Sequence, residues 1–364
     1  MSYELRSDSI IGAGEANPSL GMIGGVEFDR ENQRIKGTLL PPVYNLDQLK
    51  ELYQSQVDGL IAELPASGRV ITRLLIGENI DYHELLAFSY NHHGLVVGVE
   101  GYIPLPDNSL GLQGIVYLGG NSASRMPSVE IIRSERDILD RARKSAEERM
   151  PEVLPEGYQV QLVPANSLAG LADQDIEVLV ELYKRTYKSY TCPFTFNGIR
   201  NNAFSSVVGL VRNSKGRIVS VTMGEITPPI AGAIRMCEIS DSASDIWLKV
   251  KPVAGLTAGE FIEGNPDVYD PELRNANFWA KKAVVEYLVE KGIEVIFTES
   301  RLNWGAVMRS NFWLGLEPVG WLPRHCQISS SLESVHDSSD QGFGNLVVMA
   351  LLPEQRQTYQ RREK

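Results

Sequence analysis

Arg235-Met-Cys-Glu-Ile-Ser-Asp-Ser-Ala-Ser244 decides the fold, together with Ile293-Glu-Val-Ile-Phe-Thr-Glu-Ser300 further along the chain. Both are short runs of apolar and small residues of the kind that form buried strands. A helical segment between them is stopped by Gly292, and another helix follows and closes near Gly315. The order is therefore strand, long loop, helix, strand, helix. A strand that carries carboxylates and faces the N-terminus of a helix indicates transfer chemistry with an anionic carrier.

The composition is that of an ordinary globular protein of 364 residues, with 43% hydrophobic and 22% charged residues. A formal net charge of −11 argues against a broad surface for nucleic acid or for an anionic membrane. Three cysteines, an odd number, argue against a disulfide framework. The N-terminus lacks a basic start followed by an apolar run, and no stretch approaches the roughly 18 apolar residues of a membrane helix. We expect a soluble, cytoplasmic protein.

Composition and periodicity divide the chain into two units, with a boundary at the Pro-rich break near Pro155. The first unit, 1–155, contains an amphipathic helix over 46–64, a strand over 70–76, a helix over 82–90, strands over 95–103 and 111–118 and a charge-rich helix over 129–150. The second unit, 156–353, reads β, α, ββ, β, α, β, α and a terminal hairpin. Its ββ pair is a strong hairpin signal around Asn213-Ser-Lys-Gly216. Residues 354–364 are predicted to be a polar, frayed tail.

This order of elements resembles the GCN5-related N-acetyltransferase (GNAT) superfamily, and more narrowly the bacterial beta-lysine acetyltransferases. The resemblance covers most of the second unit and extends faintly into the first. Tyr190-Thr-Cys-Pro-Phe194 is similar to that family's Tyr-Pro-Phe-Pro segment, Glu238-Ile-Ser-Asp-Ser-Ala-Ser244 to its carboxylate-bearing strand, and Pro271-Glu-Leu-Arg274 to the start of its pyrophosphate loop. It implies an α/β (α+β) fold with a mixed, mostly antiparallel sheet flanked by helices, and a smaller N-terminal α/β domain that is a degenerate copy.

Two departures from the family pattern concern the donor. The superfamily binds the pyrophosphate of acetyl-CoA with backbone N–H groups of a Gly-rich helix start. Here Arg274 stands first, but Asn277 and Trp279 replace the two small residues, and a Trp in that loop would leave less room for a pyrophosphate. The tyrosine that often serves as general acid in the final helix is absent, with Ser310 and Asn311 near its place.

Acyl transfer to an amine needs a base for the amine and groups that hold the thioester. We expect Glu238 to be the base and Asp241 to anchor the amine. Positions three apart face opposite sides of a regular strand, so only a bulge would bring the two together. The alternative for each carboxylate is a structural ion pair with a neighbouring basic residue.

The resemblance also places the substrates. The expected donor contacts are Ser242, Ala243, Ser244, Arg274, Asn275, Ala276, Asn277 and Asn303; Cys192, Phe194 and His325 are expected to line the acceptor site. Basic residues near these elements, Lys281, Lys282, Arg301, Arg309 and Arg324, would form a patch for a 3′-phosphate or an acidic carrier, or a solvated helix face. No spacing of His, Cys, Asp or Glu indicates a metal site, and His92-His93 reads as a surface turn.

The sequence thus predicts an N-acyltransferase that moves an acyl group from a thioester to a small-molecule amine, in a biosynthetic pathway. The donor would be acyl-CoA or an acyl group on the phosphopantetheine of a carrier protein, with no tightly bound cofactor. A non-catalytic binding module of the same fold is one alternative. An aminoacyl-tRNA-dependent transferase is another, against which the acidic balance counts. A homodimer stays open.

Overall fold

The computed structural model describes residues 20–23, 26–29, 33–65, 68–106, 111–149, 151, 153–186, 195–201, 206–227, 229, 234–244, 275–302, 305–327 and 343–362. Of the expected substrate contacts, Cys192, Phe194, Arg274 and Asn303 lie outside these ranges. Among the described residues, no helix combines the length and apolar character needed to cross a membrane.

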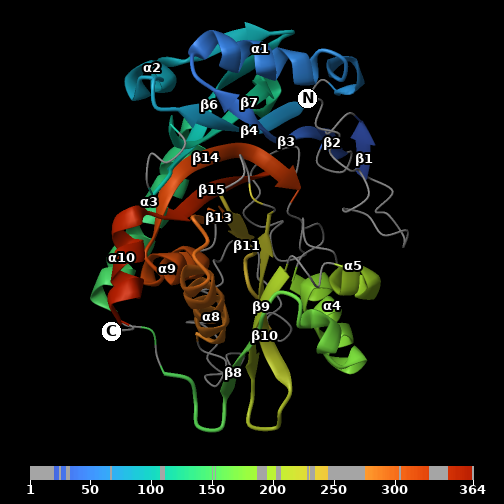
Figure 1. Ribbon diagram of the computed structural model, residues 1–364, viewed down its shortest axis with the longest axis vertical. Coiled ribbons are helices and arrows are strands. Elements are labelled where there is room, and N and C mark those ends of the chain that lie inside the picture. The colour runs from blue at the N-terminus through green and yellow to red at the C-terminus, as the bar shows by residue number, and fades with distance from the viewer. Residues whose placement is uncertain are drawn as a thin grey trace.

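The N-terminal half is a strand-rich unit that carries α1 and α2 on its outer side (Figure 1). Its elements are β1 (Leu20–Ile23), β2 (Val26–Asp29), β3 (Arg34–Val43), α1 (Leu46–Val57), η2 (Ile61–Glu63), β4 (Arg69–Gly77), α2 (Tyr82–Ala87), β5 (Ser89–His92), β6 (Leu95–Pro104), β7 (Leu112–Ser122), η4 (Ala123–Arg125) and α3 (Val129–Glu148). Asn45 caps α1 by accepting from Gln48 N–H, and Ser128 caps α3 by accepting from Ile131 N–H. The predicted helix at 129–150 and strand at 70–76 are confirmed. The helix predicted over 46–64 ends at Val57 and is followed by the short turn η2, and the helix predicted over 82–90 ends at Ala87, before β5.

The C-terminal half follows the predicted order β, α, ββ, β, α, β, α and hairpin. Its elements are β8 (Gln159–Val163), η5 (Leu168–Gly170), α4 (Asp173–Thr186), α5 (Phe196–Asn201), β9 (Ser206–Arg212), β10 (Ile218–Ile226), β11 (Met236–Ile239), β12 (Ala243–Ser244), α8 (Ala276–Glu290), β13 (Val295–Arg301), α9 (Gly305–Trp313), β14 (Leu316–Gln327), β15 (Phe343–Leu351) and α10 (Pro353–Arg362). Gly292, at φ 69°, ends α8 as expected because only glycine adopts this backbone without strain.

The polar tail is a helix rather than a frayed end. Composition alone predicted fraying, but α10 docks on the second half through two contacts. Tyr359 Oη donates to Leu314 O at 2.9 Å, and Arg356 Nη1 donates to Glu294 O at 2.8 Å. These long-range hydrogen bonds stabilise a helix that has too few apolar residues to be held by hydrophobic packing alone.

All described strands belong to one sheet in the order β1-β2-β3-β4-β7-β6-β14-β15-β13-β11-β10-β9-β8, with β5 on β6 and β12 on β10. Among the described ladders, β3–β4 and β11–β13 are parallel and the others are antiparallel. The predicted fold class, a mixed and mostly antiparallel sheet flanked by helices, is confirmed.

The two halves repeat one arrangement. In each half, a helix connects two parallel strands (β3-α1-β4 and β11-α8-β13). An antiparallel hairpin follows in each half, and its second strand pairs with the second of the two parallel strands (β7 with β4, β15 with β13). The halves meet where β6 lies beside β14 through the pair Gly101–Gly320. A Cβ on Gly101 would stand 3.0 Å from Gly320 Cα, so this close approach of two backbones requires glycine. Where the chain divides into domains stays a prediction.

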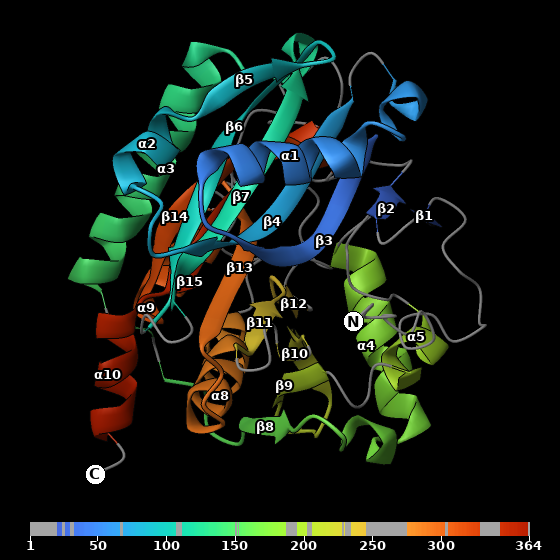
Figure 2. The same cartoon turned by 45° about the horizontal axis from the view of Figure 1, so that its top comes forward.

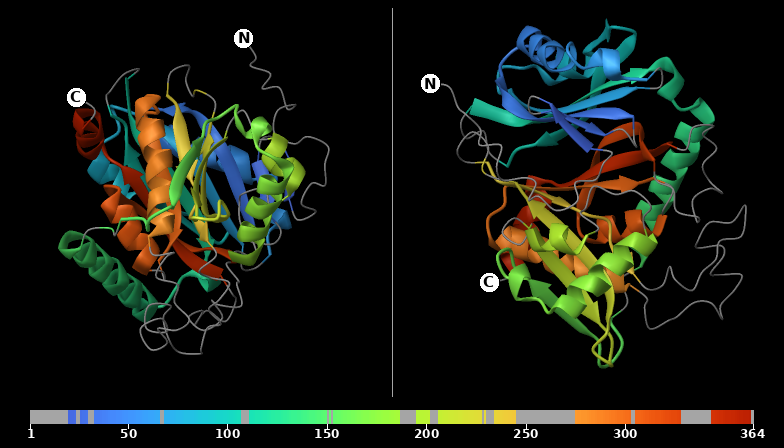
Figure 3. Two further views of the ribbon diagram at one scale, coloured as in Figure 1. Left: turned by 90° about the horizontal axis from the view of Figure 1, so that it is seen from below. Right: turned by 90° about the vertical axis from the view of Figure 1, so that its right-hand side faces the viewer.

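The sheet turns back on itself, so that the strands of the first half lie over those of the second (Figures 2 and 3). The layer between them is apolar over much of its area: Ile71, Leu75, Ile115 and Tyr117 from the first half belong to one cluster with Val295, Phe297, Leu346 and Val348 from the second. Helices α8 and α9 cover the opposite face of the second half. The parallel strands β11 and β13 therefore have one face toward the helices and one toward the first half.

Candidate functional site

The parallel strands β11 and β13 part after three residue pairs, from Met236–Val295 to Glu238–Phe297. Beyond this point β13 continues beside β15 as far as Arg301, while the other strand continues as β12 beside β10. Among the described strands, no ladder joins residues 241–244 to β13. The side of residues 241–244 that faces away from β10 is called the open edge below. A strand edge can pair with an extended chain that presents amide groups.

A one-residue bulge lies at the point where the strands part. The ladder of β10 changes register between Gly224–Ile239 and Val221–Ala243, which inserts one residue into the strand. Ser240 closes the bulge: its N–H donates to Met223 O, and its Oγ accepts from Met223 N–H at 2.9 Å. Asp241 and Ser242 then both face α8, since Ser242 Oγ donates to Asn277 O at 3.3 Å.

The bulge does not bring Glu238 and Asp241 together. Asp241 contacts Ser300 and Lys281 on the helix-covered face. Glu238 faces the first half, where Arg73 lies. The two carboxylates therefore serve opposite faces of the sheet, and their expected roles, base and amine anchor, stay predictions.

The N-terminus of α8 lies against the open edge. Asn275 is left-handed at φ 61° and gives no side-chain cap, so the first N–H groups of the helix are not satisfied by the cap residue. Asn277 is fixed below the sheet, where its Oδ1 accepts from Ser220 Oγ at 2.6 Å. The side chain of Asn277 thus positions the helix, and any donor contact here belongs to the backbone. Ser244, at the end of the edge, has a buried Oγ without a described hydrogen-bond partner.

Trp279 does not lie in the loop before the helix, as the sequence suggested. It is the fourth residue of α8, and its ring packs edge-on against Phe278, with centroids 5.2 Å apart, and beside Leu154 and Tyr158. The ring therefore belongs to the first turn of α8, which follows the left-handed Asn275, and its expected crowding of a pyrophosphate stays a prediction.

Below the open edge, a polar network is buried between α8, α9 and the sheet. Lys281 Nζ donates to Asn311 Oδ1 at 2.8 Å and to Thr298 Oγ1 at 3.4 Å, and lies 3.7 Å from Asp241 Oδ1. Asp241 Oδ1 also accepts from Ser300 Oγ at 2.7 Å. Burial lowers the pKa of Lys281, and Asp241 opposes this shift. The structure therefore favours the ion-pair reading of Asp241.

The predicted basic patch is divided. Lys281 and Arg301 are buried, at 2% and 5% exposure, so they are not part of a surface. Lys282 pairs with Glu286, four residues along the helix, and Arg324 Nη1 donates to Ser124 O at 2.9 Å. These basic residues are close in sequence because α8 and β13 follow each other, but Lys281 and Arg301 point into the protein.

On the other face of the strands, two carboxylates lie near one another. Glu238 Oε2 is 3.4 Å from Arg73 Nη1, and its side chain is 23% exposed. Glu299, two residues beyond the partner of Glu238, is buried on the same face at 7% exposure. Burial raises the pKa of Glu299, and the Glu238 carboxylate raises it further, while Lys36 and Arg73 lower it. The net shift of the Glu299 pKa is therefore upward.

His325 joins this second cluster. Arg69 Nε donates to His325 Nδ1 at 3.1 Å, which assigns the ring proton to Nε2, 3.6 Å from Glu299 Oε2. Burial lowers the pKa of His325 well below its usual value, and Arg34 and Arg69 lower it further, so the ring is neutral. The structure thus joins two of the predicted site residues, Glu238 and His325, through Glu299.

Sequence reasoning missed Glu299, Arg73 and Tyr117. Burial raises the pKa of Tyr117, and Glu299 raises it further, so its phenol stays protonated beside these groups. A signal for Glu299 exists, because it alternates with Val295 and Phe297 and so shares their face of a strand. No comparable signal exists for Arg73 or Tyr117, which come from the other half of the chain.

The sequence matches no protein-family profile and no curated protein. Solved structures give weak matches. They include a spermidine/spermine N-acetyltransferase from Vibrio cholerae (10% identity, 58% of this chain, 100% of that chain, TM-score 0.36), the acetyltransferase yncA from Salmonella typhimurium with acetyl-CoA (10%, 54%, 95%, 0.35) and a GCN5-related N-acetyltransferase from Kribbella flavida (13%, 54%, 98%, 0.33). The function proposed below is therefore argued from the geometry of this chain.

Proposed function

We propose that this chain is an N-acyltransferase, which moves an acyl group from a phosphopantetheine thioester to the amine of a small molecule. The observation that carries the proposal is the parting of β11 and β13. Beyond their last pair, residues 241–244 run beside β10 and close to the N-terminus of α8, with Glu238 and Glu299 on the opposite face of the same two strands.

The open edge suits the donor. A phosphopantetheine arm is an extended chain with two amides, which can pair with the edge as an added strand does. The phosphate at its end would meet the positive end of α8, where the cap residue leaves N–H groups available. The buried Ser244 Oγ supplies a further polar group at the edge.

The carboxylate pair suits the transfer step. Glu238, the more exposed of the two, takes a proton from the amine nitrogen as that nitrogen attacks the thioester carbonyl. The C–N bond forms and the C–S bond breaks, and the thiolate that leaves takes a proton. Glu299, whose pKa is raised by burial, is the acid that we assign to that proton, and it regains a proton from Glu238 or solvent after the reaction.

Acyl-CoA and an acylated carrier protein present the same arm, so both donors belong to the proposal. The Trp279 ring packs against the cluster of Val211, Val219, Ala276 and Ala280, so acyl-CoA stays among the donors to be tested. Beta-lysine, the acceptor that the sequence resemblance implies, is one of the small amines to be tested as acceptor substrates. A role in biosynthesis would follow from the acceptor.

The test is amine-dependent thioester cleavage, measured as thiol release from acetyl-CoA, acetyl-pantetheine and an acetylated carrier protein with a panel of diamines, polyamines and amino acids. Glu238→Gln should lower kcat/KM about 10²–10⁴-fold and leave donor affinity within about twofold. Glu286→Gln, which changes an exposed carboxylate of α8, should behave as wild type.

Donor binding without turnover by any amine would contradict the proposal and identify a binding module instead. A Glu238→Gln variant with wild-type kcat/KM would remove Glu238 from the reaction. Turnover with the carrier protein alone would restrict the donor to that class.

A further inference from the structure

The turn between β5 and β6 carries two consecutive histidines, His92 and His93, followed by Gly94. His93 has a left-handed backbone at φ 49°, and Gly94 at φ 81°. A left-handed histidine is uncommon, and such residues gather where a structure needs a particular side-chain direction. Consecutive residues of a strand point to opposite sides, but this backbone turns both imidazoles to one side.

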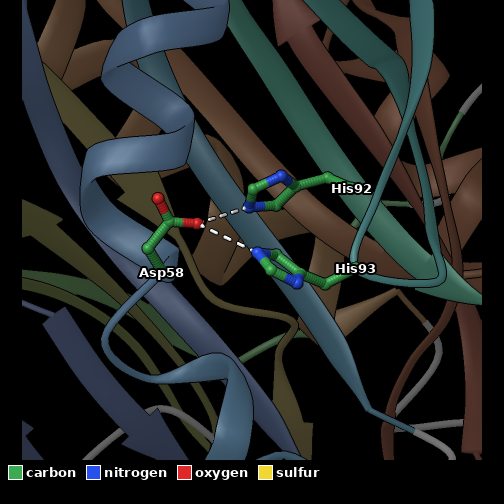
Figure 4. Close-up of side chains that lie close together, drawn as sticks. All are labelled: Asp58, His92 and His93. Atoms are coloured by element: carbon green, nitrogen blue, oxygen red, sulfur yellow. Dashed lines mark ion pairs between the residues drawn. The ribbon is translucent and has the colours of Figure 1, made fainter.

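Both rings are turned toward a single carboxylate. Asp58, the residue that follows α1, has its Oδ1 2.9 Å from His92 Nε2 and 3.5 Å from His93 Nε2 (Figure 4). The three candidate ligand atoms all lie within 4.8 Å of one another. Ligands bound to Zn²⁺ at 2.0–2.2 Å in a tetrahedron are roughly 3.4 Å apart, so this is the spacing of a metal site before any adjustment.

His92 Nε2 is the observation that an ordinary ion pair does not explain. His92 is 7% exposed, and this nitrogen is buried without a hydrogen-bond partner although Asp58 Oδ1 is so close. A hydrogen bond would need the oxygen in line with the N–H. A shared metal ion lies off the line between two of its ligands, so it can bring the two atoms close together without a hydrogen bond between them.

The surroundings hold the His92 ring in place. The rings of Tyr53 and Tyr90 pack on it, with centroids 6.0 and 6.2 Å away. Tyr53 is fully buried. The aromatic rings on one side fix the orientation of the His92 ring as a ligand. On the other side Asp58 and His93 are 56% and 58% exposed, so that a metal ion can enter from solvent.

We propose that Asp58, His92 and His93 bind a divalent transition-metal ion, with Zn²⁺ as the fitting ion and water as the fourth ligand. Two imidazole nitrogens and one carboxylate oxygen are ligands that Zn²⁺ accepts, whereas Ca²⁺ and Mg²⁺ prefer oxygen alone. The site clips the C-terminal end of α1 to the β5–β6 hairpin, whose strand β5 pairs with β6 alone. It is separate from the β11–β13 site and does not depend on the proposed function.

The experiment is a calorimetric titration of untagged, chelator-treated protein with ZnCl₂, beside Asp58→Asn and His93→Gln. Both variants change residues that are more than half exposed, so they should fold. The control is His83→Gln, an exposed histidine outside the cluster. We expect one Zn²⁺ per wild-type or control chain, and at least about tenfold weaker binding in either cluster variant.

Co²⁺ in place of Zn²⁺ gives a second readout. A visible d–d band without the intense near-ultraviolet band of thiolate ligands is expected for wild type, and its loss in Asp58→Asn. Zn²⁺ should also raise the Tm of wild type but not of the cluster variants. Equal Zn²⁺ affinity in wild type and both cluster variants, or a thiolate band that Asp58→Asn leaves unchanged, would overturn the proposal.

Discussion

Exchanging Lys281 for Met separates the two readings of Asp241. In the structure Asp241 is 2% exposed and lies 3.7 Å from the Lys281 ammonium, which is equally buried. If Asp241 is a structural partner of this lysine, removal of the lysine deprives a buried carboxylate of this cation, while hydrogen bonds such as that from Ser300 remain. If Asp241 anchors a substrate amine, Lys281 is a bystander.

The distance between the Lys281 and Asp241 charges gives the size of the expected loss of stability. Two unit charges 3.7 Å apart, at the effective dielectric constant of about 20 that describes protein sites, interact by about 4 kcal/mol. Breaking a buried ion pair by removal of one partner costs about 3–5 kcal/mol in measured cases. We therefore expect Lys281→Met to lower the free energy of unfolding by about 4 kcal/mol, and Asp241→Asn by a similar amount.

The assay is urea unfolding followed by circular dichroism, with the slope m compared between variants to confirm a single transition. The double variant Lys281→Met, Asp241→Asn completes the cycle. It should be more stable than the sum of the two single losses predicts, because neither charge is then left unpaired.

Two results would refute this reasoning. One is a loss below about 1 kcal/mol in Lys281→Met, which would mean that the pair is not closed as described. The other is an Asp241→Asn variant with wild-type stability and a raised KM for the amine, which would restore Asp241 as the amine anchor.

Two further predictions concern the layer between the halves. Because the folded pKa of Glu299 is raised above its usual 4.5, its stabilising contribution is complete below pH 4.5 and is lost as the pH rises through the folded value. The unfolding free energy of Glu299→Gln relative to wild type should thus increase with pH across that window, and a pH-independent difference would contradict the assigned burial. Arg69 donates to Glu100, Asn121 and His325 while fully buried, so Arg69→Met should cost about 3–5 kcal/mol in urea unfolding; a midpoint like that of wild type would mean that the halves do not depend on it.

The sequence predicted the order of elements because local signals mark them. Gly216, at φ 76°, makes the turn of the β9–β10 hairpin, and Gly292 ends α8. The apolar run from Ile293 to Ser300 covers all of β13 except its last residue, Arg301, and Glu238 lies on a short strand, as its neighbours indicated. These are local properties of backbone conformation and hydrophobic pattern, which one sequence contains.

The rest depends on contacts between residues that are far apart in the chain. Arg73 meets Glu238 across 165 positions, and Arg69 meets His325 across 256, because the first half of the sheet folds over the second. No local pattern in the sequence indicates that packing. Asp58 and the His92–His93 turn are also distant in the chain, and they meet within the first half, at the end of α1. The spacing of these three residues in the sequence therefore did not indicate a metal site.

The most direct test of the central claim, that a phosphopantetheine thioester lies along the open edge at 241–244, is the Kd of acetyl-CoA for wild type and Ser244→Ala. Removing a buried hydroxyl that has no described partner should leave folding intact. We expect saturable binding to wild type and about fivefold weaker binding to the variant. This ratio corresponds to the loss of about 1 kcal/mol of binding free energy, the contribution of one hydrogen bond. Equal affinity in the two proteins, or no binding to wild type by acetyl-CoA and acetyl-pantetheine alike, would contradict it.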